Sequence, residues 1–203
     1  MSERFKNLLQ RSVASARAFR DDQSGVAAVE FCFIATLMIT LWLGTMEISQ
    51  GIEVNKKVGR SASVIADLVA QELEYPVATI NDIMKVGAAV LQPYNRDTPV
   101  VTVTEIKIDA ALNATVYWSR RLEGTTFSTP FAANAPVLNV PANLKIADTH
   151  LVRVETQLEY IPVTSWSIKK NATGPNGAYA SVNMAETYYL RPRGGNFVDC
   201  IGC

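Results

Sequence analysis

Apolar residues dominate one stretch near the start of the chain. From Val26 to Met46 the sequence holds 21 residues, and Glu30 is the only charged side chain among them. A helix of that length spans about 31 Å, enough for the hydrocarbon core of a bilayer. A carboxylate inside such a segment costs about 2.5–3.5 kcal/mol near the bilayer centre and less towards its edge. The pattern therefore predicts a membrane-spanning helix over 26–46. The cost of its one carboxylate indicates that Glu30 has a functional role.

The helical pattern continues after Met46. No proline occurs between Val26 and Tyr75, and Lys56, Lys57, Arg60 and Asp67 fall away from the apolar stripe. That stripe, at steps of three or four residues, consists of Val54, Val58, Ala62, Ile65 and Val69. We therefore expect one helix from Val26 to Glu74, about 70 Å long, with residues 47–74 outside the membrane.

The remaining residues, 75–203, are enough to bury a core of their own. Pro76 breaks the first helix, and Thr79 is expected to cap a second helix that ends before Pro93. Its predicted core face consists of Ile80, Ile83, Met84 and Leu91.

Alternation with a period of two then predicts four strands. They lie around residues 100–109, 116–118, 152–160 and 182–190, and the turn 110–113 joins the first two into a hairpin. The positions expected on the apolar faces of these strands are Val100, Ile106, Ile108, Val152, Val154, Leu158 and Tyr160, and Val182, Met184, Tyr188 and Leu190 mark the last strand. Those expected to point outward are Glu105, Lys107, Asp109, Arg153, Glu155, Gln157 and Glu159. Strands that follow helices without β-α-β alternation favour an α+β domain, an antiparallel sheet with helix on one face.

The balance of basic and acidic residues bears on which classes of partner the chain is expected to bind. The chain has 19 basic and 19 acidic side chains, so nothing favours a nucleic acid or an anionic surface. Five basic residues precede the apolar stretch, which favours a cytoplasmic N-terminus and an exported C-terminal part. Lys56, Lys57 and Arg60 dilute that bias.

The motif at the start of the apolar stretch resembles the N-terminus of TadE-like (TadE/TadG) pilins. These belong to the tight-adherence (Flp-type) branch of type IV pilins, and the similarity covers roughly residues 20–70. Gly25 corresponds to the last residue of the basic leader 1–25, and Val26 to the mature N-terminus. Glu30 and Phe31 then occupy the family's fifth and sixth positions. The tail from Tyr188 to Cys200 is also similar to TadE-like endings.

This resemblance implies a role in assembly. The expected function is that of a minor pilin or pilin-like assembly protein, supporting pilus biogenesis, adhesion and biofilm formation. It implies cleavage between Gly25 and Val26 by a prepilin peptidase, and pairing of Glu30 with a neighbouring subunit's amine. The expected partners are the bacterial inner membrane, other pilins and the pilus assembly platform, with the domain 75–203 in the periplasm. The alternative is an uncleaved single-pass anchor that presents a periplasmic scaffold or binding domain.

The same residues allow plainer interpretations. Gly25 could simply precede a helix capped by Ser24, with Glu30 solvated at headgroup level. A cleavable secretory signal fits less well, because its apolar core is shorter and no A-x-A-like site follows Gly44.

The three cysteines suggest structure more than catalysis. Cys32, inside the apolar stretch, is expected to be a small buried hydrophobe. Cys200 and Cys203 end the chain, and an oxidising compartment favours a disulfide between them or to another chain. Metal binding and free thiols are the weaker alternatives.

No catalytic motif stands out. His150 is the only histidine, it is expected to be a surface or capping group, and no nucleophile elbow or phosphate-binding glycine loop is present. We therefore expect no enzyme activity and no cofactor. Two long irregular segments, 124–147 and 169–179, are candidate contact surfaces or solvated loops. Asn113 and Asn171 lie in glycosylation-like sequences, which carry little weight here.

Overall fold

The computed structural model describes residues 25–94, 97–163 and 181–203. The chain divides into two compact units, 1–46 and 47–203. Helix α2, Val26–Val69, begins in the first unit and ends in the second. The prediction that it reaches Glu74 is wrong, because Glu74–Pro76 form strand β1, which pairs with the distant strand β7, Asp199–Ile201. No local pattern could reveal that pairing.

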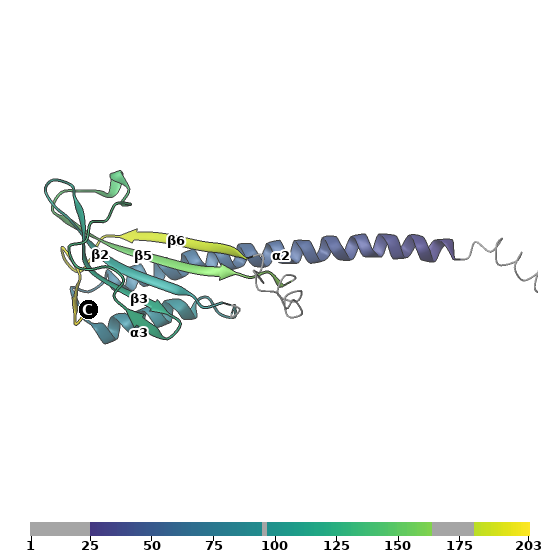
Figure 1. The fold of residues 1–203 in the computed structure, drawn as a ribbon, viewed down its shortest axis with the longest axis horizontal. Helices are drawn as coiled ribbons and strands as arrows, with labels where there is room; N and C mark the ends of the chain where they lie inside the picture. Colours follow the sequence, from purple (N-terminus) through teal and green to yellow (C-terminus); the bar gives the residue numbers. More distant parts are fainter. Residues whose placement is uncertain (1–24, 95–96, 164–180) are drawn as a thin grey trace, which may run out of the picture. The chain divides into compact units, whose positions relative to one another are not determined.

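The second unit has an α+β fold, as predicted. Its main sheet has five antiparallel strands in the order β4-β3-β2-β5-β6, drawn as arrows in Figure 1. The four predicted strands correspond to β2 (Val100–Ile108), β3 (Ala114–Glu123), β5 (Thr149–Tyr160) and β6 (Val182–Leu190). The additional strand, β4 (Thr126–Ser128), is too short to show alternation. Strands β1 and β7 form a separate parallel pair.

The β2–β3 hairpin contains a bulge that reorients its aromatic side chains. Glu105 lies opposite Trp118 and Ile106 lies opposite Val116, so that Tyr117 has no partner of its own in the ladder. Such an extra residue bends the strand and re-aims its side chain.

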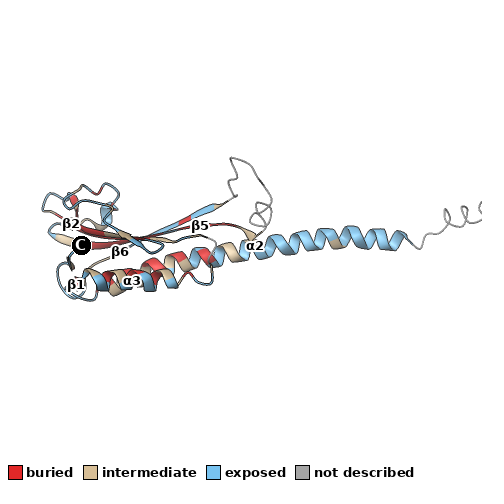
Figure 2. Ribbon diagram, turned by 60° about the horizontal axis from the view of Figure 1, so that its bottom comes forward, coloured by how far each residue is buried: buried red, intermediate tan, exposed pale blue. Residues whose placement is uncertain are grey.

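Helices cover one face of this sheet (Figures 1 and 2). Helix α3, Val77–Ala89, lies beside α2, and Gly87 lets the two approach so closely that a Cβ there would overlap the Ile65 side chain. The buried stripe on α2 confirms Val54, Val58, Ala62, Ile65 and Val69 as core positions. These residues pack with buried residues of the sheet and of α3, including Ile80, Met84, Val101, Val103, Trp118, Val152, Val154 and Leu158.

The predicted cap of α3 is wrong. The helix starts at Val77, and Pro76 occupies the N-cap position with no side-chain hydrogen bond. Pro76 has φ −61° and ψ 143°, the extended backbone typical of an N-cap residue, so the helix starts without a capping hydroxyl. Thr79 therefore lies inside the first turn. Ile80 and Met84 are buried as predicted, Ile83 is partly buried, and Leu91 is buried just beyond the helix.

The other face of the sheet is partly covered by the segment 124–147. Its Val137 and Val140 pack on Ile106, Ile108 and Leu151. The segment also contains β4 and a short 3₁₀ helix, Ala142–Leu144, and it packs on the sheet through Val137 and Val140 although most of its residues are exposed.

Burial on both faces changes two predictions for the central strands. Glu105 and Arg153, expected to be exposed, are 0% and 6% exposed. Alternation separates the two faces within one strand, but it does not show that Glu105 shares a face with Val152 or that other segments cover both faces.

Strand β6 is mostly exposed. Met184 is buried, whereas Val182 and Tyr188 are 54% and 43% exposed. Because β6 is an edge strand of the sheet, fewer neighbours cover its side chains.

Candidate functional site

The first half of α2 has the character of a membrane segment. Among the described residues, it is the one helix long and apolar enough to cross a membrane, with a window of mean hydropathy 2.1 that has no buried residue. Its exposed large apolar side chains include Val26, Val29, Phe31, Phe33, Ile34, Leu37, Met38, Ile39, Leu41 and Trp42. An apolar surface this continuous is stable when lipid or other protein covers it.

The predicted processing and registry residues lie at the start of this helix. Gly25 immediately precedes α2, and its carbonyl accepts a hydrogen bond from Val29 N at 3.1 Å. Val26 and Phe31 are 53% and 70% exposed, and Glu30 is exposed without an ion-pair partner among the described residues. Because Val26 and Glu30 are four positions apart, they lie on the same side of the helix. Ser24 and the rest of the leader lie outside the described residues.

The cysteines differ in their surroundings. Cys200 and Cys203 form a disulfide with a Cα–Cα separation of 5.6 Å. Cys32 is exposed on the apolar half of α2, so the expectation that it is buried does not hold within this chain. The reason is that this half of the helix has no packed neighbours from the described part of the chain.

The C-terminal segment is fixed to the second unit by backbone contacts. Asp199 N donates to the Leu73 carbonyl at 2.8 Å, and Arg193 N donates to the Ala70 carbonyl at 2.7 Å. Arg193 also forms an ion pair with Asp67 at 2.6 Å. These contacts hold the tail, including its disulfide, against the end of α2 and strand β1.

A buried polar cluster under this tail was missed by the sequence analysis. The Glu105 carboxylate accepts a hydrogen bond from Val198 N at 3.2 Å, and His150 Nδ1 lies 3.3 Å from the same oxygen. Trp118 Nε1 donates to the Val198 carbonyl at 2.8 Å. Burial raises the pKa of Glu105, and the contacts with His150 and Val198 offset part of that rise. We call Glu105, His150, Trp118 and Val198 the tail clasp.

Its histidine was predicted to be a surface or capping group, and this is wrong. The His150 side chain is 13% exposed and lies against the rings of Tyr117 and Phe197, with centroids 5.5 Å away in both cases. The alternation placed Glu105 away from Ile106, but no sequence signal showed that the tail would return to cover it.

A cavity of about 300 Å³ lies on the opposite face of the sheet, under part of segment 124–147. We call it the loop cavity. Its lining is mostly apolar and includes the charged pair Arg153 and Glu155; the other lining residues are Val116, Phe131, Ala135, Pro136, Val137, Leu138 and Asn139.

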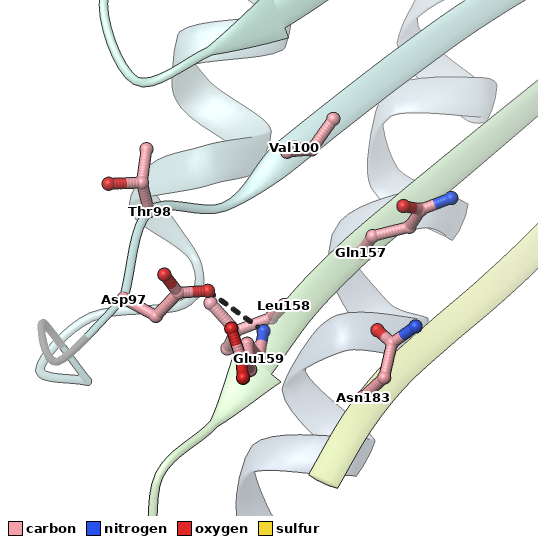
Figure 3. Close-up of a pocket in the computed structure, with 7 residues that line it drawn as sticks. All are labelled: Asp97, Thr98, Val100, Gln157, Leu158, Glu159 and Asn183. Atoms are coloured by element: carbon pink, nitrogen blue, oxygen red, sulfur yellow. Dashed lines mark hydrogen bonds between the residues drawn. The ribbon is translucent and has the colours of Figure 1, made fainter. Parts of the chain in front are cut away.

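A second cavity of about 310 Å³ lies at the far end of β5 (Figure 3). Polar side chains of Asp97, Gln157, Glu159 and Asn183 line it, and the Asp97 carboxylate accepts a hydrogen bond from Glu159 N at 2.9 Å. Within the described ranges, no group of three or more histidine, cysteine or acidic residues is placed to hold a metal ion.

Known proteins do not add to this description. A scan against protein-family models and searches of curated proteins and of solved structures give no match to the chain. The function must therefore be argued from the chain's own residues and geometry.

Proposed function

We propose that this protein is a minor pilin or pilin-like assembly protein of a tight-adherence pilus system. One observation carries the proposal. Helix α2 begins at Val26, directly after Gly25, and a single run of 44 residues supplies both an exposed apolar half and the core stripe of the α+β unit. A subunit that passes from lipid into a filament needs an apolar helix that can exchange one apolar neighbour for another.

Glu30 gives this helix its specificity. It is the only charge between Val26 and Met46, and it is exposed and unpaired within the described chain. A carboxylate in an apolar surrounding gains most when a cation from a neighbouring chain approaches it. In the proposed mechanism, Glu30 pairs with the Val26 amine of the next subunit after cleavage behind Gly25, which fixes the register between subunits.

The uncleaved anchor remains the second candidate. In that case 26–46 would hold the second unit at the inner membrane permanently, and the protein would act as a periplasmic scaffold. Sequencing the N-terminus of protein purified from its native membrane separates the two. A start at Val26 supports the pilin, whereas a start at Met1 or Ser2 supports the anchor.

The registry role has its own test. We expect Glu30→Gln to reduce recovered pili about tenfold or more, because the substitution removes a desolvated ion pair between subunits. Glu53→Gln is the matched control, since Glu53 lies on the same helix and pairs with Lys57 of its own chain at 3.1 Å near the surface. Electron microscopy of sheared pili, with immunoblots for total subunit, gives the readout. Normal piliation by the Glu30 variant would refute the role.

A further inference from the structure

The loop cavity has a rigid frame built by three neighbouring strands. Thr104 on β2 lies opposite Ser119 on β3 and Arg153 on β5, so that the three side chains share one face. The Ser119 hydroxyl donates to the Phe131 carbonyl at 2.9 Å and accepts from Phe131 N at 3.0 Å. These bonds fix the start of the covering segment above the sheet.

The far side of the cover is also fixed by its backbone. Val116 N donates to the Ala135 carbonyl, and Val137 N donates to the Ala114 carbonyl, both at 2.9 Å. The segment is therefore attached to β3 on both sides of the cavity. A space of about 300 Å³ under a hydrogen-bonded cover is already formed before a ligand arrives.

Arg153 is the unusual member of the lining. It is 6% exposed, its Nη2 pairs with Glu155 Oε2 at 3.2 Å, and its guanidinium lies over the Phe131 ring at 5.8 Å from the centroid. Its Nε and the Thr104 hydroxyl beside it are buried without a hydrogen-bond partner among the described residues. A guanidinium has five N–H donors, and leaving buried donors unmatched is costly. Arg153 therefore has donor capacity that the described residues do not use.

The remaining lining indicates which kind of acceptor fits that donor capacity. Phe131, Pro136 and Leu138 surround the pair with apolar surface, and Leu138 is 86% exposed at the opening. Glu155 already balances the charge of Arg153, which disfavours a dianion such as phosphate. A carboxylate presents two oxygens that fit a guanidinium. Because it carries one negative charge rather than two, it is repelled less by Glu155 than a dianion is.

We propose that the loop cavity binds a carboxylate carried on a small apolar group, of the size of one apolar amino acid. The carboxylate accepts hydrogen bonds from Arg153, and the apolar group lies against Phe131 and Leu138. The ligand is either a free small molecule or the C-terminal residue of a peptide, since both present the same chemistry. This inference does not depend on the proposed role in pili.

The test compares an acid with its amide. The full-length chain in lipid nanodiscs is titrated with N-acetylphenylalanine and with N-acetylphenylalaninamide, and binding is followed by ligand-observed NMR. We expect the acid to bind about tenfold tighter or more, as for a charge-assisted hydrogen bond. A peptide ending in phenylalanine, with a free or an amidated C-terminus, then distinguishes the two sources of the carboxylate.

Two arginines provide a matched pair of variants. Arg121, on the same face of the sheet, pairs with Glu123 at 3.2 Å and also has a buried unpartnered Nε, but it is not part of the cavity lining. Arg153→Met should weaken binding of the acid about tenfold or more, whereas Arg121→Met should leave it unchanged.

Ala135→Leu provides a variant that keeps Arg153. It fills the cavity from the cover and should abolish binding even if Arg153→Met fails to fold. The proposal is overturned if acid and amide bind equally, if both arginine variants lose affinity equally, or if the acid shows no binding at millimolar concentration. In each of these cases Arg153 does not bind a carboxylate in the loop cavity.

Discussion

Glutamine in place of Glu105 tests the electrostatics of the tail clasp. The carboxylate is 0% exposed, and its pKa is raised above the ordinary value of 4.5 because burial disfavours the charged form. Glutamine keeps an oxygen that can accept from Val198 N but cannot ionise. The substitution therefore removes the cost of burying a charge while keeping one hydrogen bond.

The sign follows from proton linkage. Between the unfolded and the native pKa, the native protein binds a proton that the unfolded chain has released, so the free energy of unfolding falls as pH rises. One group contributes at most about 1.4 kcal/mol per pH unit to that slope. The stabilisation by protonated Glu105 is complete below pH 4.5, the ordinary pKa of the group, and it is lost as the pH rises through the raised pKa in the native protein. The free energy of unfolding of the Glu105→Gln variant, relative to that of wild type, should therefore increase with pH.

The assay is denaturant unfolding of the full-length chain in nonionic micelles from about pH 4 to about pH 8. Trp118 reports directly on the clasp, because its indole N–H binds the Val198 carbonyl. Replacing Trp42 and Trp166 by phenylalanine leaves Trp118 as the only tryptophan. Repeating the comparison with His150→Gln separates the titration of the histidine from that of the carboxylate.

Glu123→Gln is the control, since that carboxylate is 61% exposed and pairs with Arg121 at the surface. Its difference from wild type should show little dependence on pH. Parallel stability curves for wild type and Glu105→Gln across the whole range would refute the assignment of a raised pKa. If the stability of Glu105→Gln relative to wild type falls as the pH rises, the pKa of Glu105 is lowered rather than raised.

Two further substitutions test the packing of the second unit. Trp118→Phe should lower the free energy of unfolding by about 1–3 kcal/mol, because the Val198 carbonyl loses its buried donor. Thermal melts measure the loss of stability, and the tail should be cleaved faster by proteases. An unchanged rate of tail proteolysis would contradict the prediction. Gly87→Ala should cost about 1–3 kcal/mol, since the new methyl overlaps Ile65 at the contact of the two helices, and a smaller cost in an Ile65→Ala background, measured by a double-mutant cycle, is the expected signature.

The helices were the most predictable part of the fold. Their apolar periodicity is local, and it identified the buried stripe of α2 from Val54 to Val69 and the core residues Ile80 and Met84. The end of α2 was not predictable, because it depends on β1 pairing with a strand near the C-terminus. Likewise, alternation located four strands, whereas the three-residue strand β4 carries no periodic signal.

The buried charged residues show the limit of alternation more clearly. Glu105 and Arg153 have the pattern of solvent-facing positions, but Glu105 lies on the face of the sheet that carries Val152, and Arg153 lies on the opposite face. What buries them is distant in sequence: the tail residue Val198 covers Glu105, and the segment at Phe131 covers Arg153. A charge at a sheet position was therefore the visible signal, but its surroundings required the folded chain.

The two faces of strands β2 and β5 therefore carry different polar groups, covered by different segments. On one face, β2 and β5 use the Glu105 and His150 side chains to fix the tail; on the other, β5 presents Arg153 to the loop cavity. In the clasp, Val198 N donates to Glu105 Oε1, whereas Glu105 Oε2 has no hydrogen-bond partner among the described residues. Unmatched polar atoms therefore do not separate the two places, since Arg153 Nε is also buried without a partner there. Arg153 differs in that it lines a cavity of about 300 Å³, so the loop cavity is where this unit is best suited to meet a ligand.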